Sequence, residues 1–183
     1  MLIALSGTPG TGKTAVSTVL KEKGYKVLSL YEIAVSNSLT CGTDKKRNTT
    51  LIDIAGIDEY IKKEYGESDD LIFVEGHASH LLESARYVII LRCHPKELKK
   101  RLKMKKWKIE KIKENVEAEI LDIILCEAVD LHEEDRIFEI DTTDKTIDET
   151  VSSIQEIINN KFQPLTRYRI GGIDWSEEIL KDI

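Results

Sequence analysis

Cysteine is scarce in this sequence, and long apolar runs are absent from it. Cys41, Cys93 and Cys126 are widely separated and form no CxxC pair, so they suggest neither a disulfide framework nor a zinc knuckle. No stretch reaches the roughly 18 apolar residues that span a membrane. The N-terminal run MLIALSGTPG is too short for a signal peptide and lacks a basic leader. We therefore expect a soluble cytoplasmic protein without a membrane partner.

Excess negative charge argues against a general DNA-binding protein, although the charge is unevenly spread. The chain of 183 residues is 41% hydrophobic and 33% charged, which suits one compact domain, and its formal net charge is −6. Residues 96–113 hold nine Lys and one Arg against two Glu, a balance of +8 that leaves −14 on the remainder. This basic segment is either a solvated helix face or a surface that contacts phosphate or RNA.

Short apolar runs alternate with helical patterns along the chain. Helices are expected from about Lys13 to Lys23, from Pro95 onward, over about 109–132 and over 147–161. Strands are expected at the apolar runs Leu2–Ser6, Lys26–Leu30, Leu71–Glu75, Tyr87–Leu91 and Ile137–Ile140. Five strands joined by helical crossovers predict an α/β fold with a parallel sheet covered on both faces.

The segment GTPGTGKT, residues 7–14, matches the phosphate-binding pattern GxxxxGK[ST] and falls between a predicted strand and a predicted helix. Its glycines let backbone N–H groups turn towards phosphate oxygens, and the start of the helix adds positive potential there. Lys13 would reach the β- and γ-phosphates as a catalytic cation, and Thr14 would supply a hydroxyl ligand to Mg²⁺. The ATP-binding residues expected in this P-loop are Gly7, Pro9, Gly10, Thr11, Gly12, Lys13, Thr14 and Ala15.

A second magnesium partner is expected where a neighbouring strand ends. The run Leu71–Glu75 is apolar up to its final carboxylate, which places Glu75 beside the P-loop as a ligand of Mg²⁺ through a water. His77 follows two residues later and is a catalytic candidate that could orient a water or a hydroxyl near the γ-phosphate. His80 is a weaker candidate, and either histidine could instead be structural.

Three sequence features together resemble one branch of the adenylate kinases. They are the P-loop, the acid-x-His sequence at residues 75–77, and the pattern LxxRL at residues 98–102 that follows Leu-Arg at 91–92. The branch is adenylate kinase isoenzyme 6, also called the coilin-interacting nuclear ATPase. Its archaeal members are similar in length and in residues 114–120 (ENVEAEI).

The resemblance covers residues 1–161 and implies a nucleoside monophosphate (NMP) kinase fold. This is a P-loop NTPase fold of three α/β/α layers, with a five-stranded parallel sheet in the order 2-3-1-4-5. It also implies a mobile NMP-binding region at about 31–66 and a short lid at about 104–108 that closes over the phosphates. Residues 162–183 would form a C-terminal extension.

The resemblance also assigns residues to the two nucleotides. Arg101 would stack on the adenine of ATP, and the loop of residues 142–145 would line the base through Thr143 and Lys145. Many relatives have a second arginine at the position of Lys105. A compact ammonium group therefore replaces a planar guanidinium group there.

The acceptor side departs from the family pattern. Adenylate kinases tend to carry GDLxR after the second strand, whereas residues 31–35 (YEIAV) lack the arginine that would hold the phosphate of AMP. The basic cluster at residues 45–47 could substitute for it, or could be ordinary surface charge. The AMP-binding candidates are Glu32, Lys46, Arg47 and Asp53.

Several functions remain open from the sequence. The first is an ATP:AMP phosphotransferase that requires Mg²⁺ and also hydrolyses ATP. The second is an assembly factor whose ATP hydrolysis controls its binding of a basic small-subunit ribosomal protein on the pre-ribosomal small subunit, with negligible kinase activity as one form of it. The third is a kinase of another small substrate, such as CMP or shikimate.

Overall fold

A five-stranded parallel sheet forms the centre of the molecule in the computed structural model, which describes residues 1–44 and 49–180. Its strands are β1 (Leu2–Gly7), β2 (Lys26–Ser29), β5 (Ile72–Glu75), β6 (Tyr87–Arg92) and β7 (Ile137–Asp141), which confirms the five predicted strands. They stand in the order β2-β5-β1-β6-β7. Counted along the chain within this sheet, that is the expected 2-3-1-4-5, and the P-loop NTPase fold class is confirmed.

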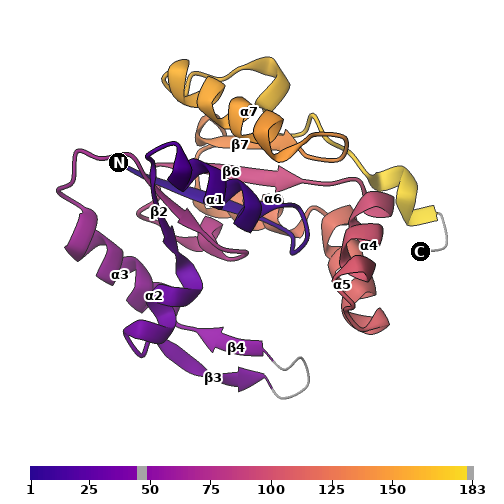
Figure 1. Ribbon diagram of the computed structural model, residues 1–183, viewed down its shortest axis with the longest axis horizontal. Helices are drawn as coiled ribbons and strands as arrows, with labels where there is room; N and C mark the ends of the chain where they lie inside the picture. Colours follow the sequence, from indigo (N-terminus) through magenta and orange to yellow (C-terminus); the bar gives the residue numbers. More distant parts are fainter. Residues whose placement is uncertain (45–48, 181–183) are drawn as a thin grey trace.

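Helices cover both faces of the sheet because alternate side chains of each strand point to opposite sides. Ile3 and Leu5 of β1 pack against α1 (Lys13–Glu22) and α7 (Ile147–Asn159). Leu2 and Ala4 lie in a second cluster on the other face, with residues of α2 (Leu30–Ser36), α3 (Ile54–Tyr65) and α6 (Ile123–Leu131). The arrangement is a three-layer α/β/α sandwich (Figure 1).

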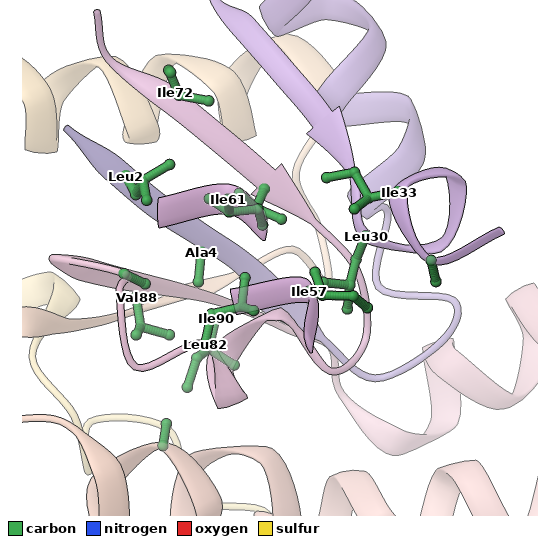
Figure 2. Close-up of a cluster of buried hydrophobic side chains, with 14 of the residues drawn as sticks. Leu2, Ala4, Leu30, Ile33, Ile57, Ile61, Ile72, Leu82, Val88 and Ile90 are labelled. Atoms are coloured by element: carbon green, nitrogen blue, oxygen red, sulfur yellow. The ribbon is translucent and has the colours of Figure 1, made fainter. Parts of the chain in front are cut away.

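The second cluster shows how the core is filled. Figure 2 labels its main side chains: Leu2, Ala4, Leu30, Ile33, Ile57, Ile61, Ile72, Leu82, Val88 and Ile90. A fully buried Leu or Ile contributes roughly 1.5–3 kcal/mol, against about 1 kcal/mol for a helix cap. Packing of the layers therefore dominates the stability of the fold, and it holds the loops at the carboxyl ends of the strands in place.

Two features differ from the sequence prediction. The helix predicted over 109–132 is divided into α5 (Ile109–Ile120) and α6, because Asp122 adopts a left-handed conformation with φ 52°. Apolar positions continue across the break, so periodicity alone could not show it. A hairpin of β3 (Thr40–Asp44) and β4 (Thr49–Ile52) was also missed, since its strands carry threonines and Gly42 rather than an apolar pattern.

The remaining helical elements of the described residues are one further α-helix and four short 3₁₀ turns. As expected, Pro95 opens a helix, α4 (Pro95–Met104), and it packs on α5 in a third apolar cluster. Short 3₁₀ turns are η1 (Ser79–Leu81), η2 (Glu134–Arg136), η3 (Thr166–Tyr168) and η4 (Ser176–Leu180). No helix within residues 1–44 and 49–180 has the length and apolar character needed to cross a membrane.

The C-terminal segment packs on the body of the protein. Tyr168 is buried in the α1–α7 layer and donates a hydrogen bond of 2.7 Å to Glu156. Trp175 packs edge-on against His94, with ring centroids 4.9 Å apart. Figure 1 shows this segment, in yellow, beside α4.

Candidate active site

The turn between β1 and α1 requires glycine at two points. Gly7 has φ +142°, and a Cβ there would lie 2.4 Å from the carbonyl oxygen of Leu91. Gly10 has φ +103°, and a Cβ there would lie 2.8 Å from a methyl carbon of Leu98. The GxxxxGK[ST] segment therefore folds as the sequence predicts, pressed against β6 and α4 and followed at once by a helix N-terminus.

Lys13 is a buried cation at the centre of this loop. Its side chain is only 7% exposed, and its Nζ donates to the carbonyl oxygens of Gly7, at 2.5 Å, and Thr8, at 3.1 Å. Burial lowers the pKa of Lys13 to about 8, although the nearby carboxylates of Glu75 and Glu119 act in the opposite direction. The ammonium therefore remains mainly protonated at neutral pH, in a site where an incoming phosphate would find little competing water.

Thr14 and Glu75 bring two hard oxygen ligands together. The Thr14 Oγ1 lies 3.4 Å from a carboxylate oxygen of Glu75, and both residues line the same cavity. This spacing and donor type suit Mg²⁺, which prefers oxygen ligands and usually completes its shell with phosphates and water. Within the described ranges, no group of three or more His, Cys, Asp or Glu is placed to hold a metal. Mg²⁺ would thus be held jointly by these two residues and the bound nucleotide.

One cavity of about 1170 Å³ runs over the P-loop and extends to both sides of it. Its walls include residues that follow β2 and residues that follow β7. Because β2 and β7 are the opposite edges of the sheet and β1 is its centre, the cavity extends on either side of the phosphate loop. Met104, Lys105 and Trp107, from the segment between α4 and α5, also line it.

On the β7 side, Arg101 braces the loop that was predicted to line a base. Its guanidinium donates to the carbonyl oxygens of Thr142, at 2.8 Å, and Thr143, at 2.9 Å. Arg101, Thr142 and Lys145 line the cavity, as do Thr146 and Ile147, which the sequence reasoning missed.

The side chain of Thr143 has a different environment from the one its predicted role implies. Its Oγ1 accepts a 2.8 Å hydrogen bond from the His94 backbone N–H and lies 2.5 Å from a carboxylate oxygen of Asp141. Thr143 is not among the residues that line the cavity. A contact between Thr143 and the base stays a prediction that this geometry does not favour. Its neighbour Thr142 does line the cavity.

The two histidines after β5 differ in position. His77 lines the cavity, and burial, with a further contribution from Lys13, lowers the pKa of its imidazole. His80 is buried away from that wall: its ring nitrogens lie 2.9 Å from the Ser6 Oγ and 2.9 Å from a Glu127 carboxylate oxygen. His77 therefore lies at the cavity wall, whereas His80 is held by partners in the interior.

Of the predicted AMP-binding residues, the two that the structure describes do not line the cavity. Glu32 is exposed, and Asp53 caps α3 by accepting a 3.0 Å hydrogen bond from Gly56; neither lines the cavity. Lys46 and Arg47 lie outside the described residues. On this side the walls are formed by Ser29, Leu30, Tyr31, Thr50 and Ile52. The only signal in the sequence for this wall was that Tyr31 opens the segment where relatives carry their acceptor motif.

Comparison with known proteins places the chain in a family. An AAA domain model matches residues 3–122. A protein from Archaeoglobus fulgidus is 42% identical over 98% of this chain and 94% of its own length, and one from Methanocaldococcus jannaschii is 37% identical over 97% and 94%. Each bears the name "Putative adenylate kinase". The chain belongs to this family of adenylate kinase homologues.

The fold of this adenylate kinase homologue is also that of other P-loop kinases. Shikimate kinase from Acinetobacter baumannii in complex with shikimate superposes with a TM-score of 0.59 at 16% identity, over 87% of this chain and 93% of that one. Thymidylate kinase from Candida albicans has a TM-score of 0.57 at 16% identity, over 88% and 92%. Because these kinases share one architecture, the residues that line each cavity must determine which phosphoryl acceptor binds.

Two buried charged residues of this adenylate kinase homologue were not assigned a role from the sequence. Arg92 ends β6 and Glu119 lies near the end of α5, and each is 2% exposed. Glu119 accepts a hydrogen bond from the Thr8 hydroxyl in the P-loop. The sequence did show a charged residue, Arg92, at the end of the apolar strand Tyr87–Arg92. Only the tertiary structure reveals which residues Arg92 contacts.

Proposed function

We propose that this protein is an adenylate kinase, which transfers the γ-phosphoryl group of ATP to AMP with Mg²⁺ bound. The observation that carries the proposal is the single cavity that extends from the P-loop towards both edges of the sheet. Two nucleotides that meet at the P-loop would fill such a space from opposite sides. The names of the archaeal relatives support the same reaction.

In this proposal the chain's own groups hold the phosphates and exclude water. Lys13 exchanges its two carbonyl partners for β- and γ-phosphate oxygens, and it offsets the charge that develops there. Thr14 and Glu75, the latter through a water, would hold Mg²⁺, which when bound would offset the negative charge of the phosphates. A phosphate oxygen of AMP attacks the γ-phosphorus while the bond to the bridging oxygen breaks, and two ADP result.

Two segments would enclose this reaction. We assign residues 104–108 as the lid, because Met104, Lys105 and Trp107 line the cavity and the charge of Lys105 helps to lower the pKa of Lys13. We assign residues 31–66 as the acceptor region, since Tyr31, Thr50 and Ile52 form the opposite wall. Residues 1–161 would then be the catalytic domain, and 162–183 a C-terminal extension whose Tyr168 and Trp175 pack on it.

The test follows ADP in reactions that contain the protein, Mg²⁺ and ATP, with and without AMP. Adenylate kinase activity produces two ADP for each ATP consumed, and only when AMP is present. CMP and shikimate are added separately as competing acceptors. Transfer to one of these with none to AMP would overturn the assignment of the acceptor. Thr14→Ala and Glu75→Gln should both raise the Mg²⁺ concentration that half-maximal activity requires.

We further propose that the protein hydrolyses ATP and assists maturation of the small ribosomal subunit in the cytoplasm, as members of the isoenzyme 6 branch are thought to do. The observation that favours hydrolysis is His77, which lines the cavity two residues after Glu75 with its pKa lowered by burial. A neutral imidazole there can orient an attacking water. The acidic remainder of the chain suits a basic small-subunit ribosomal protein as the partner.

His77→Ala separates hydrolysis from transfer to AMP. Because AMP brings its own nucleophile, the variant should lose ATP hydrolysis by about 10²-fold and much less of its AMP phosphorylation. ADP formation is measured without AMP, with AMP, and with a basic small-subunit ribosomal protein. Equal losses in all three reactions would show that His77 organises the shared site. A wild-type protein that phosphorylates AMP but does not hydrolyse ATP would remove the hydrolysis proposal.

A further inference from the structure

A buried cluster of charged residues lies behind the P-loop, outside the cavity walls. Arg92, Glu119 and Glu139 are 2%, 2% and 1% exposed. The Arg92 guanidinium donates to Glu119 at 2.8 Å and contacts the carboxylates of Glu139 and Asp122 as well. Burial alone would lower the pKa of Arg92, but these carboxylates raise it above its ordinary range. The guanidinium is therefore a permanent cation that fixes the positions of the surrounding carboxylates.

Only one of these carboxylates reaches the P-loop. Glu119 accepts a hydrogen bond from the Thr8 Oγ1 with one oxygen, and its other oxygen accepts from the Cys93 backbone N–H at 3.1 Å. Glu139 instead accepts a 2.9 Å hydrogen bond from the Gly171 N–H in the C-terminal segment. The two glutamates share Arg92 but connect it to different parts of the chain.

Thr8 is the residue through which Glu119 acts on the phosphate site. Its side chain is buried and directed to Glu119, while its carbonyl oxygen accepts from Lys13 Nζ at 3.1 Å and from the Thr11 Oγ1 at 2.9 Å. The hydroxyl of Thr8 thus fixes the backbone on which the phosphate-binding lysine rests. Because α5 begins at Ile109, directly after the lid segment, Glu119 joins the helix that follows the lid to the P-loop.

We infer that Glu119 is a positioning residue for ATP, which holds Thr8 so that the P-loop keeps its phosphate-binding shape. The inference rests on the ATP side of the proposed reaction and not on the identity of the acceptor. A charge-assisted hydrogen bond inside a buried site is among the stronger polar contacts in proteins, which makes it suitable for this role. Arg92 holds the carboxylate of Glu119 in position. Glu139, which accepts from Gly171, contributes only to the stability of the fold.

The test compares variants that differ in which part of the network they remove. Thr8→Val deletes the hydroxyl with almost no change in volume, and Thr8→Ser restores it. Calorimetry with ATP and Mg²⁺, without AMP, should show binding about tenfold weaker for Thr8→Val and within about twofold of wild type for Thr8→Ser. Unchanged ATP affinity in Thr8→Val would overturn the inference, and so would an equal loss in Thr8→Ser.

The two glutamates provide the matched control. Glu119→Gln and Glu139→Gln each remove one negative charge beside Arg92, so both should lower the melting temperature. Only Glu119→Gln should also weaken ATP binding. Equal losses of ATP affinity in both would show a purely structural cluster, and should Glu119→Gln fail to fold, the two Thr8 variants still decide. Absence of AMP-dependent ADP formation in the wild type would count against the kinase proposal alone, since ATP binding is measured without AMP.

Discussion

The two sides of the cavity are built differently. On the ATP side, the P-loop and the loop after β7 are tied to each other: the Thr142 Oγ1 lies 3.0 Å from the carbonyl oxygen of Thr11, and Arg101 donates to the carbonyls of Thr142 and Thr143. On the acceptor side, the strands β3 and β4 pair with each other and not with the central sheet. Figure 1 shows this hairpin projecting from the body below α2.

This difference matches what each side would bind in the proposed reaction. A triphosphate and Mg²⁺ present the same charges in every kinase reaction of this kind, so a rigid loop of buried backbone groups and one lysine serves them all. The acceptor varies between enzymes, and the solved structures with this fold are named for shikimate and for thymidylate. The acceptor wall is therefore expected to tolerate substitution better than the ATP wall.

The largest effect is expected from Lys13→Ala on the ATP side. Loss of the buried cation removes the main stabilisation of charge on the γ-phosphoryl group and should lower turnover by about 10³-fold, with the fold retained. Steady-state ADP formation measures the effect, and circular dichroism checks folding. Lys21→Ala, an exposed lysine of the same helix, is the control. Turnover of Lys13→Ala near the wild-type value would show that the P-loop does not bind the reacting phosphates.

Arg101→Ala tests the other end of the ATP side. If the guanidinium stacks on adenine as well as bracing residues 142–143, ATP affinity should fall by on the order of 1 kcal/mol or more, which is about fivefold or greater. Calorimetric titration with ATP measures it, with the exposed Lys103 of the same helix changed to Ala as the control. Equal ATP affinity in Arg101→Ala and wild type would restrict Arg101 to bracing residues 142–143, without a contact to the nucleotide.

Tyr31→Ala tests whether the acceptor side binds independently. The tyrosine is 59% exposed and lines the cavity, so its loss should raise the KM for AMP about fivefold and leave the KM for ATP within about twofold. Val35→Ala, on the same helix but away from the cavity wall, is the matched control. A parallel rise in both KM values would show that the two sides act as one unit, and the comparison would fail.

The smallest effect is expected from the pH dependence of stability at His80, which lies behind the loop after β5 on the acceptor side of β1. Burial lowers the pKa of His80 in the folded state, despite the opposing effect of Glu127, whereas the unfolded value is about 6.5. His80 thus favours folding above pH 6.5, and this contribution is lost as pH falls towards the folded pKa, at no more than about 1.4 kcal/mol per pH unit.

Thermal unfolding of wild type and His80→Gln between pH 8 and pH 5 measures that contribution. The melting temperature of wild type should fall more steeply below pH 6.5 than that of the variant. His77, Glu127 and His132 face the same region and remain in both proteins, so the difference between the two curves belongs to His80. Identical curves would show that His80 does not titrate differently in the folded and unfolded states.

The sequence by itself determined the sheet, the P-loop and the pairing of Thr14 with Glu75, the two ligands proposed for Mg²⁺. Five apolar runs predicted five strands, because a parallel sheet covered on both faces needs continuous apolar strands. The spacing of residues 7–14 predicted the turn, since only glycine fits beside the Leu91 carbonyl. The strand ending in Glu75 predicted a carboxylate near Thr14, and the two lie 3.4 Å apart. These features depend on local pattern, which a sequence displays directly.

Only the tertiary structure decided which residues line the cavity on the β2 side, the surroundings of the two histidines and the charge cluster behind the P-loop. Thr8 and Glu119 are 111 positions apart in the chain. Their hydrogen bond exists because α5 packs on α4 and is tied to the end of β6 by Arg92. His77 and His80 differ by three positions, yet one lines the cavity and the other is buried against Glu127. A side chain's role depends on partners that are distant in sequence, and the packing of the layers brings those partners together.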